Sequence, residues 1–180
     1  TKQVSFYEEM TNVPFIIAGP GIHPRQIPVE DLMTQPTIDL LPTLCELAGI
    51  PVPSSKPGIS LAPFLKGEKQ KRQHPYAASE WHSEYEVTVS PGRMIRSPRY
   101  KYTHYLEGNG EELYDMLKDK GERRNLAHDP KYSKILAEHR ALLDDYIRRT
   151  QDDYRSLKVE ADKRWRSHAP GYPNHEGPCA

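Results

Sequence analysis

Residues 1–21 read TKQVSFYEEMTNVPFIIAGPG and contain the clearest local pattern of the chain. A polar stretch ends with Tyr-Glu-Glu at 7–9, and an apolar run at 15–18 follows and is closed by Gly-Pro-Gly at 19–21. Short apolar runs bounded by glycine and proline are typical of strands covered on both faces. We therefore predict a buried strand over residues 13–18, which needs neighbouring strands for pairing.

The composition places the chain among folded, loop-rich proteins. It has 180 residues with 25 basic and 25 acidic side chains, so its zero net charge gives no electrostatic support for nucleic-acid binding. No apolar run approaches the roughly twenty residues that span a bilayer. The first residue is not Met, so we expect residues to precede it, and the missing leader peptide says nothing about export.

Residues 37–49 carry apolar side chains at helical spacing. Thr37 is a candidate N-cap and Gly49 a candidate C-cap, whereas Pro42 is expected to kink or restart the helix. The apolar stripe predicts packing against the first strand, with Cys45 as a buried free thiol on that stripe.

After the linker that begins at residue 66, the pattern changes to short β-forming runs separated by turn residues. These runs predict a small antiparallel sheet. They lie at 76–81, 93–96, 100–105 and 111–115.

A long amphipathic helix is predicted over residues 130–150, extending to about 153. Asp129 can cap it, and Pro130 suits its first position. His139 lies on the apolar stripe, which favours a packed histidine over a metal ligand. No self-contained catalytic motif is present, and the adjacent carboxylates of Glu8 and Glu9 are expected to point apart into solvent.

Three parts of the chain resemble the sulfatase family of the alkaline-phosphatase superfamily. Lys2 stands five residues before the Tyr-Glu-Glu triplet, and Val-Pro, the apolar run and Gly-Pro-Gly follow in the family's order. The helix with Asp-Leu-Leu-Pro-Thr-Leu at 39–44 and Ala-Gly at 48–49 is the second match. The run 95–127 is the most specific match, because its spacing is similar to that of the sulfatase C-terminal subdomain over about thirty residues.

The resemblance implies an α/β fold in which this chain is the C-terminal portion. Residues 1–67 would end the large alkaline-phosphatase-like sheet domain. Residues 68–153 would form a small C-terminal antiparallel sheet packed by a long helix, and residues 154–180 a tail.

By the same resemblance, the whole protein would hydrolyse sulfate esters of a carbohydrate or aryl sulfate. The family uses a formylglycine made from a Cys/Ser-x-Pro-x-Arg motif, with Ca²⁺ as a Lewis acid. Neither that motif nor an Asp-rich metal site occurs in this sequence. The nucleophile and the Ca²⁺ ligands are therefore expected upstream, and this chain alone is expected to be inactive.

The resemblance assigns one catalytic residue, Lys2, whose ammonium would contact the sulfate and offset charge on the leaving group. Its other reading is a solvated terminal lysine. His82 and His104 are candidate substrate-binding residues, because each lies among aromatic and polar neighbours that suit a sugar. A structural role remains the alternative for both histidines.

Two other functions stay open at this point. One is a phosphomonoester or phosphonate hydrolase of the same superfamily, and the other is a non-catalytic module that binds a sulfated glycan. The upstream sequence discriminates among them. The expected partners are a sulfated small molecule or glycan and the upstream part of the same protein, without nucleic acid or a membrane span. The family favours a periplasmic, secreted or lysosomal location.

Overall fold

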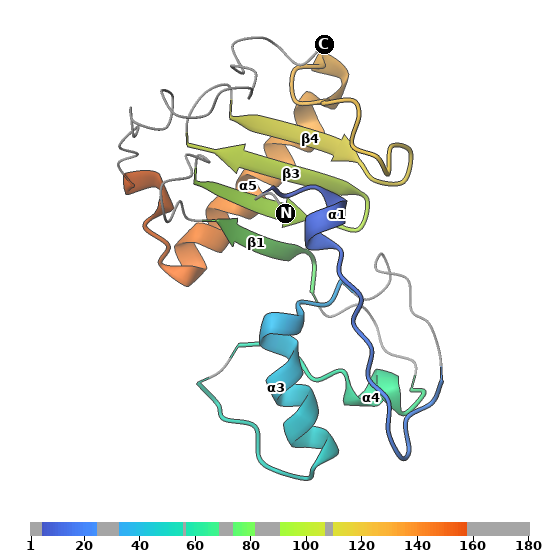
Figure 1. The fold of residues 1–180 in the computed structure, drawn as a ribbon. Helices are drawn as coiled ribbons and strands as arrows, with labels where there is room; N and C mark the ends of the chain where they lie inside the picture. Colours follow the sequence, from blue (N-terminus) through green and yellow to red (C-terminus); the bar gives the residue numbers. More distant parts are fainter. Residues whose placement is uncertain are drawn as a thin grey trace, which may run out of the picture.

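A computed structural model describes residues 5–24, 33–55, 57–68, 74–81, 91–106 and 110–157. Figure 1 shows two regions. The sheet region, residues 74–157, contains a small sheet with a long helix behind it and the N-terminal segment, residues 5–11, in front. The α3 region, residues 12–68, lies below and contains two helices joined by extended connections (Figure 1).

The sheet is an antiparallel meander in the order β1-β2-β3-β4. Its strands are β1 (Ala77–Trp81), β2 (Gly92–Arg96), β3 (Tyr100–Tyr105) and β4 (Glu111–Asp115). Ile95 lies opposite Tyr102, and Tyr102 lies opposite Leu113, so these apolar side chains share one face. The predicted small antiparallel sheet is confirmed.

The long helix α5 (Ser133–Thr150) packs on that apolar face. It follows one 3-10 turn, η1 (Pro130–Tyr132), and Asp129 caps that turn by accepting a hydrogen bond from the Lys131 backbone N–H at 3.1 Å. A second 3-10 turn, η2 (Tyr154–Ser156), follows α5. The predicted helix is confirmed. The core between α5 and the sheet consists of Tyr76, Ile95, Tyr102, Leu113, Leu126, Leu136 and Leu143.

The outer edge of β4 is closed by the side chain of Asn125. Its Oδ1 accepts from the Leu113 N–H at 3.0 Å, and its Nδ2 donates to the Glu111 carbonyl at 3.0 Å. The next residue, Leu126, donates its N–H to the Leu113 carbonyl at 2.8 Å. The side chain and the following backbone thus take the place of a fifth strand.

The opposite face of the sheet is covered by the N-terminal segment and its short helix α1 (Glu8–Thr11). Phe6 is buried against Tyr105, with 5.8 Å between ring centroids. A Cβ on Gly92 would lie 2.6 Å from the Phe6 ring, so only glycine permits this approach. Phe6 therefore fixes the segment to one place on the sheet.

In the α3 region, α3 (Pro36–Leu47) runs unbroken through Pro42, which departs from the predicted kink, and α4 (Ala62–Leu65) lies beside it. Proline at 42 cannot donate to the Ile38 carbonyl, four residues earlier. Gly58 packs against that carbonyl with φ +108°, where a Cβ would lie 2.0 Å from the oxygen. The helix starts at Pro36 rather than after Thr37, and Gly49 follows its end with φ +68°.

The face of α3 that is buried is polar, so the expectation that its apolar stripe packs on a strand is wrong. Asp39 and Thr43 are fully buried, whereas the exposed fractions of three leucines are 40–50%. The Asp39 carboxylate accepts from the backbone N–H groups of Gln35 (2.8 Å) and Ile59 (2.9 Å). Its Oδ1 also lies 3.0 Å from His74 Nε2. The leucines are Leu40, Leu41 and Leu44, and Cys45 is half-buried rather than buried.

The predicted buried strand at 13–18 is also wrong. These residues are extended but pair with no described strand, and the exposed fraction of Ile16 is 85%. An apolar run becomes a strand only where neighbouring backbone satisfies its N–H and C=O groups. The described sheet offers none to this run. Among the helices described here, none is long and apolar enough to cross a membrane.

Candidate active-site segment

The three residues predicted for the site differ in what the structure describes of them. Lys2 and His82 lie outside the described residues. His104 lies on β3, on the face covered by α5 and η2. Their roles therefore stay predictions.

His104 is held by the buried Tyr154 of η2. Its Nδ1 lies 2.8 Å from the Tyr154 hydroxyl oxygen, and that hydroxyl donates to the His104 carbonyl at 2.7 Å. Because the hydroxyl proton is used in that bond, Nδ1 carries the ring proton and donates to the hydroxyl oxygen. Burial lowers the pKa of His104 below its usual 6.5, so the ring is neutral at neutral pH. Nε2 is then the nitrogen that can accept a hydrogen bond from a ligand.

A buried ion cluster joins the N-terminal segment to the opposite face of the sheet. Lys101 of β3 is 1% exposed, and its Nζ lies 2.7 Å from Glu8 Oε1 and 2.8 Å from Glu122 Oε1. Nζ also donates to the Phe6 carbonyl at 2.9 Å. The Glu8 backbone N–H donates to Glu122 Oε2 at 2.7 Å. We call Glu8, Lys101 and Glu122 the lysine cluster.

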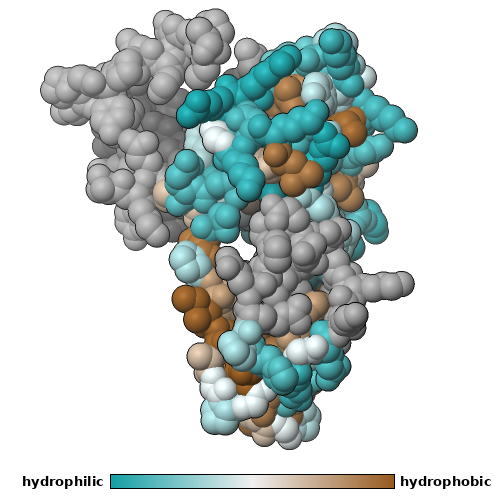
Figure 2. Space-filling view, turned by 90° about the vertical axis from the view of Figure 1, so that its right-hand side faces the viewer, coloured by the Kyte–Doolittle hydropathy of each residue, from teal (hydrophilic) through white to brown (hydrophobic). Residues whose placement is uncertain are grey.

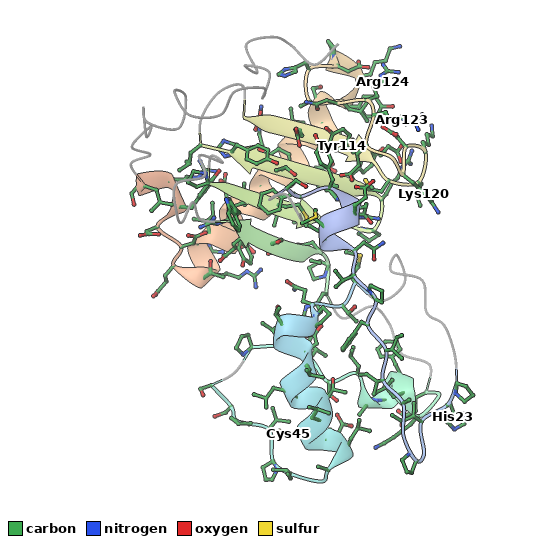
Figure 3. The ribbon with its side chains drawn as sticks, in the orientation of Figure 1. His23, Cys45, Tyr114, Lys120, Arg123 and Arg124 are labelled. Carbon is green, nitrogen blue, oxygen red and sulfur yellow. The ribbon has the colours of Figure 1, made fainter. Side chains whose placement is uncertain are left out.

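Further carboxyl and phenol groups share the face of the lysine cluster. Glu112 lies on β4 opposite Thr103, and burial followed by the neighbouring Glu122 raises its pKa. Burial, followed by the charge of Glu112, likewise raises the pKa of Tyr114, which Figure 3 labels on the same strand. Acidic groups are crowded here, and two buried cations offset them: Lys101, and Arg96, whose Nε lies 3.8 Å from Glu8 Oε1.

Sequence reasoning missed the lysine cluster. The expectation that Glu8 faces solvent is wrong, because its carboxylate pairs with Lys101, whereas Glu9 is exposed as expected. One signal was available: the aromatic side chains at 100 and 102 share one face of β3, which places Lys101 on the other. That pattern did not reveal which acidic residues, 93 positions before and 21 after Lys101, would meet it.

A groove of 1360 Å³ runs between the two regions, along β1. It is lined mainly by apolar side chains, with aromatic and polar ones among them, from the N-terminal segment, the start of α3, residues 57–59, β1 and the end of α5. Arg149 donates to the Tyr76 hydroxyl and to Asp145, so its charge is already paired. The lining includes Tyr76, Trp81, Tyr146, Arg149 and His74.

A basic loop after β4 forms the far edge of the sheet region. Figure 3 shows Lys120, Arg123 and Arg124 projecting outward there. Asp119 accepts hydrogen bonds from the backbone N–H groups of both arginines, each at 2.9 Å.

Within the part of the chain that the structure describes, no three His, Cys, Asp or Glu side chains group closely enough to hold a metal ion. The Ca²⁺ ligands that the resemblance implies upstream of this chain stay a prediction.

Comparison with known proteins gives a family match over most of the chain. The family described as "N-sulphoglucosamine sulphohydrolase, C-terminal" matches residues 2–149. A Delta 4,5-hexuronate-2-O-sulfatase of Bacteroides thetaiotaomicron is 76% identical over 180 residues, which are 100% of this chain and 37% of that protein. Human arylsulfatase K is 33% identical over 134 residues, covering 69% of this chain and 24% of that protein.

A solved 2-O GAG sulfatase superposes with a TM-score of 0.87 at 76% identity, covering 99% of this chain and 38% of that one. This chain therefore has the same fold as the matching part of that sulfatase. This chain spans less than two fifths of the length of these relatives.

Proposed function

This chain belongs to the sulfatase family, and from that membership we propose that the longer protein containing it hydrolyses a sulfate ester of a carbohydrate. The observation that carries the proposal is the 76% identity, over all 180 residues, to a Delta 4,5-hexuronate-2-O-sulfatase. The finer proposal is that the substrate is a 2-O-sulfated, unsaturated hexuronate at the end of a glycan chain.

Sulfate release from defined disaccharides tests the proposal. The longer protein should release sulfate from a Δ4,5-hexuronate carrying a 2-O-sulfate, and not from a matched disaccharide sulfated on the amino sugar alone. Hydrolysis of a phosphate or phosphonate monoester in preference to both would support the other hydrolase of the superfamily. Binding of the disaccharide without release would support a glycan-binding module.

Lys2 is the residue of this chain that we propose acts on the sulfate. An ammonium beside the leaving oxygen would offset its developing negative charge. Loss of one such contact commonly costs about 2.7–4 kcal/mol, or a hundred- to a thousandfold in rate. Lys2→Ala in the longer protein should therefore lower kcat by about that factor without changing the melting temperature. Unchanged kcat would remove Lys2 from the site.

His82 and His104 are proposed to line the rim of the sulfate pocket. For His104 the contact would come from Nε2, since Nδ1 is engaged by Tyr154. His104→Gln should raise KM more than it lowers kcat, because a rim residue binds ground state and transition state alike. A substrate affinity unchanged in both His82→Ala and His104→Gln would exclude this role.

Formylglycine and Ca²⁺ are proposed to belong to the part of the protein outside this chain. This sequence contains no Cys/Ser-x-Pro-x-Arg motif, and its described residues offer no metal-ligand set. When bound, Ca²⁺ would supply Lewis-acid chemistry at the sulfate. The 180-residue chain should accordingly show no sulfatase activity when purified alone, and activity there would contradict the proposed division.

The same part of the protein is proposed to cover the exposed apolar side chains of the α3 region. Figure 2 shows hydrophobic residues at the surface below a mainly hydrophilic sheet region. Large exposed apolar patches mark interaction surfaces. The relatives are longer than this chain, which supports a covering segment from the same protein. That segment would contact Ile16, Leu40, Leu41, Leu44, Ile50 and Val52.

A further inference from the structure

We propose that the lysine cluster is a positioning device for Lys2, so that Lys101 and Glu122 act on the reaction through the placement of that residue. The inference rests on the proposed function of Lys2. It concerns Lys101 and Glu122, which the structure describes, whereas Lys2 lies outside the described residues.

The bonds of the cluster end on the N-terminal segment. Lys101 is bonded to the Glu8 carboxylate and to the Phe6 carbonyl, and Glu122 accepts from the Glu8 backbone N–H. Lys101 of the sheet and Glu122 of the loop after β4 therefore bond to the backbone of residues 6–8 and to the Glu8 side chain. A cluster that served only the sheet would not need bonds to the backbone of this segment.

The chemistry of the cluster favours fixed geometry over stability. Taking the charges of Lys101 and Glu122 out of water is costly, and buried ion pairs often stabilise a fold no better than apolar side chains of similar volume. What they provide is one arrangement, because any slip of the segment leaves a buried charge unpaired. The Glu122 backbone has φ +51°. The Glu122 N–H donates to the Asp119 carbonyl at 3.1 Å, which closes a turn.

Lys2 is tied covalently to this fixed point. It precedes Phe6 by four residues, so an extended chain keeps the two Cα atoms within about 14 Å. Phe6 is in turn pressed against Tyr105 where Gly92 makes room. A catalytic group displaced by about 1 Å can lose a hundredfold in rate. Anchoring the segment this close to Lys2 therefore bears directly on kcat.

The test is a double-mutant cycle in the longer protein. Lys101→Met should lower kcat on the 2-O-sulfated disaccharide about tenfold to a hundredfold, with KM changed less than about threefold. In the Lys2→Ala background Lys101→Met should lower kcat no further, because the Lys2 ammonium that Lys101 positions is then absent. Equal losses in both backgrounds, or no loss in either, would overturn the inference.

Two further variants guard against loss of folding. Glu122→Gln keeps the size of the side chain and the Lys101–Glu8 pair, so it should fold and show the same non-additivity at smaller size. Leu143→Ala destabilises the core behind the sheet without touching the segment, so well below its melting temperature its kcat should stay within about twofold of the parent. If Lys2→Ala alone leaves kcat unchanged, the proposed function of Lys2 fails. If Lys2→Ala is severe and Lys101→Met and Glu122→Gln are silent, only this inference fails.

Discussion

The sheet region and the α3 region solve the problem of burial in opposite ways. The sheet region encloses an apolar core between α5 and the sheet, and its large hydrophobic residues exposed among the described residues are two, Tyr7 and Leu117. The α3 region exposes seven, from Val13 to Val52, while it buries the carboxylate of Asp39. The first region has a continuous apolar core beside its buried ion pairs, whereas the second buries only a few apolar side chains beside its polar bonds to backbone.

This difference indicates how each region depends on its surroundings. Burial of apolar area is the main source of folding free energy, so a region that already encloses its core can stand alone. A region held by a few hydrogen bonds contributes about 0.5–1.5 kcal/mol for each bond and leaves its apolar surface for a neighbour. The α3 region should therefore be the first part of this chain to open.

The largest effect is expected in the core of the sheet region. Leu143 is 1% exposed, and Leu143→Ala should lower the free energy of unfolding by about 2–5 kcal/mol through lost burial and the cavity left behind. Urea denaturation followed by circular dichroism measures it. A loss below about 1 kcal/mol would mean that this region is packed no better than the other.

The next effect is expected at the polar anchor of the α3 region. Asp39→Ala leaves the Gln35 and Ile59 N–H groups without their acceptor, at a cost of about 1–3 kcal/mol. The loss should be local, so hydrogen exchange should accelerate at those two amides and not in β3. Asp39→Asn keeps one acceptor oxygen and serves as the matched control. Acceleration that reaches β3 equally would show that the two regions open together.

Acid should weaken the sheet region through two histidines, the half-buried His104 and the buried His139. Burial lowers the pKa values of His104 and His139 below the usual 6.5, so the unfolded chain binds these protons more readily. Their contribution is complete above the unfolded pKa and is lost as pH falls through the folded values. The melting temperature should therefore decline from about pH 7.5 to about pH 5.5.

Arg140 holds the pKa of the Glu111 carboxyl at about 2. The stability that this ionised carboxylate contributes should therefore be lost only at lower pH. Replacing either histidine by glutamine should flatten the decline above pH 5.5. A slope unchanged in both variants would contradict the assignment.

The smallest effect is expected on the exposed side of α3. Leu44 is 50% exposed, so Leu44→Gln should change the free energy of unfolding of the 180-residue chain by no more than about 0.5 kcal/mol. Leu117→Gln, in the sheet region, is the control with similar exposure. In the longer protein only the Leu44 substitution should become destabilising, and equal behaviour of both would argue against a covered surface.

Local patterns predicted the sheet region well. The alternating aromatic residues of 100–105 and the turn residues before and after them define β3, and Asp129 with Pro130 marks the start of the long helix. These signals act over a few residues, within one strand or one turn. The helix at 36–47 was predicted for the same reason, but not which face it buries.

Distant partners decided the rest. The run at 13–18 has the composition of a buried strand, yet pairing depends on strands that this run does not meet in the described structure. The role of Glu8 depends on Lys101, 93 residues away, and no periodicity within either segment encodes that meeting. The site predicted from the sequence rested on family resemblance, which selected Lys2 without revealing the lysine cluster.

Asn125 has a consequence for how copies of this chain can associate. Unpaired backbone along a sheet edge invites another molecule to add a strand, and repeated addition leads to fibres. At β4 the outward groups of Glu111 and Leu113 are already bonded to Asn125 and Leu126, and the Asp115 carbonyl accepts from Lys118 and Asp119. At the other edge, the Ala78 N–H is occupied by Gln35. One amide side chain thus makes β4 a closed boundary that resists intermolecular growth.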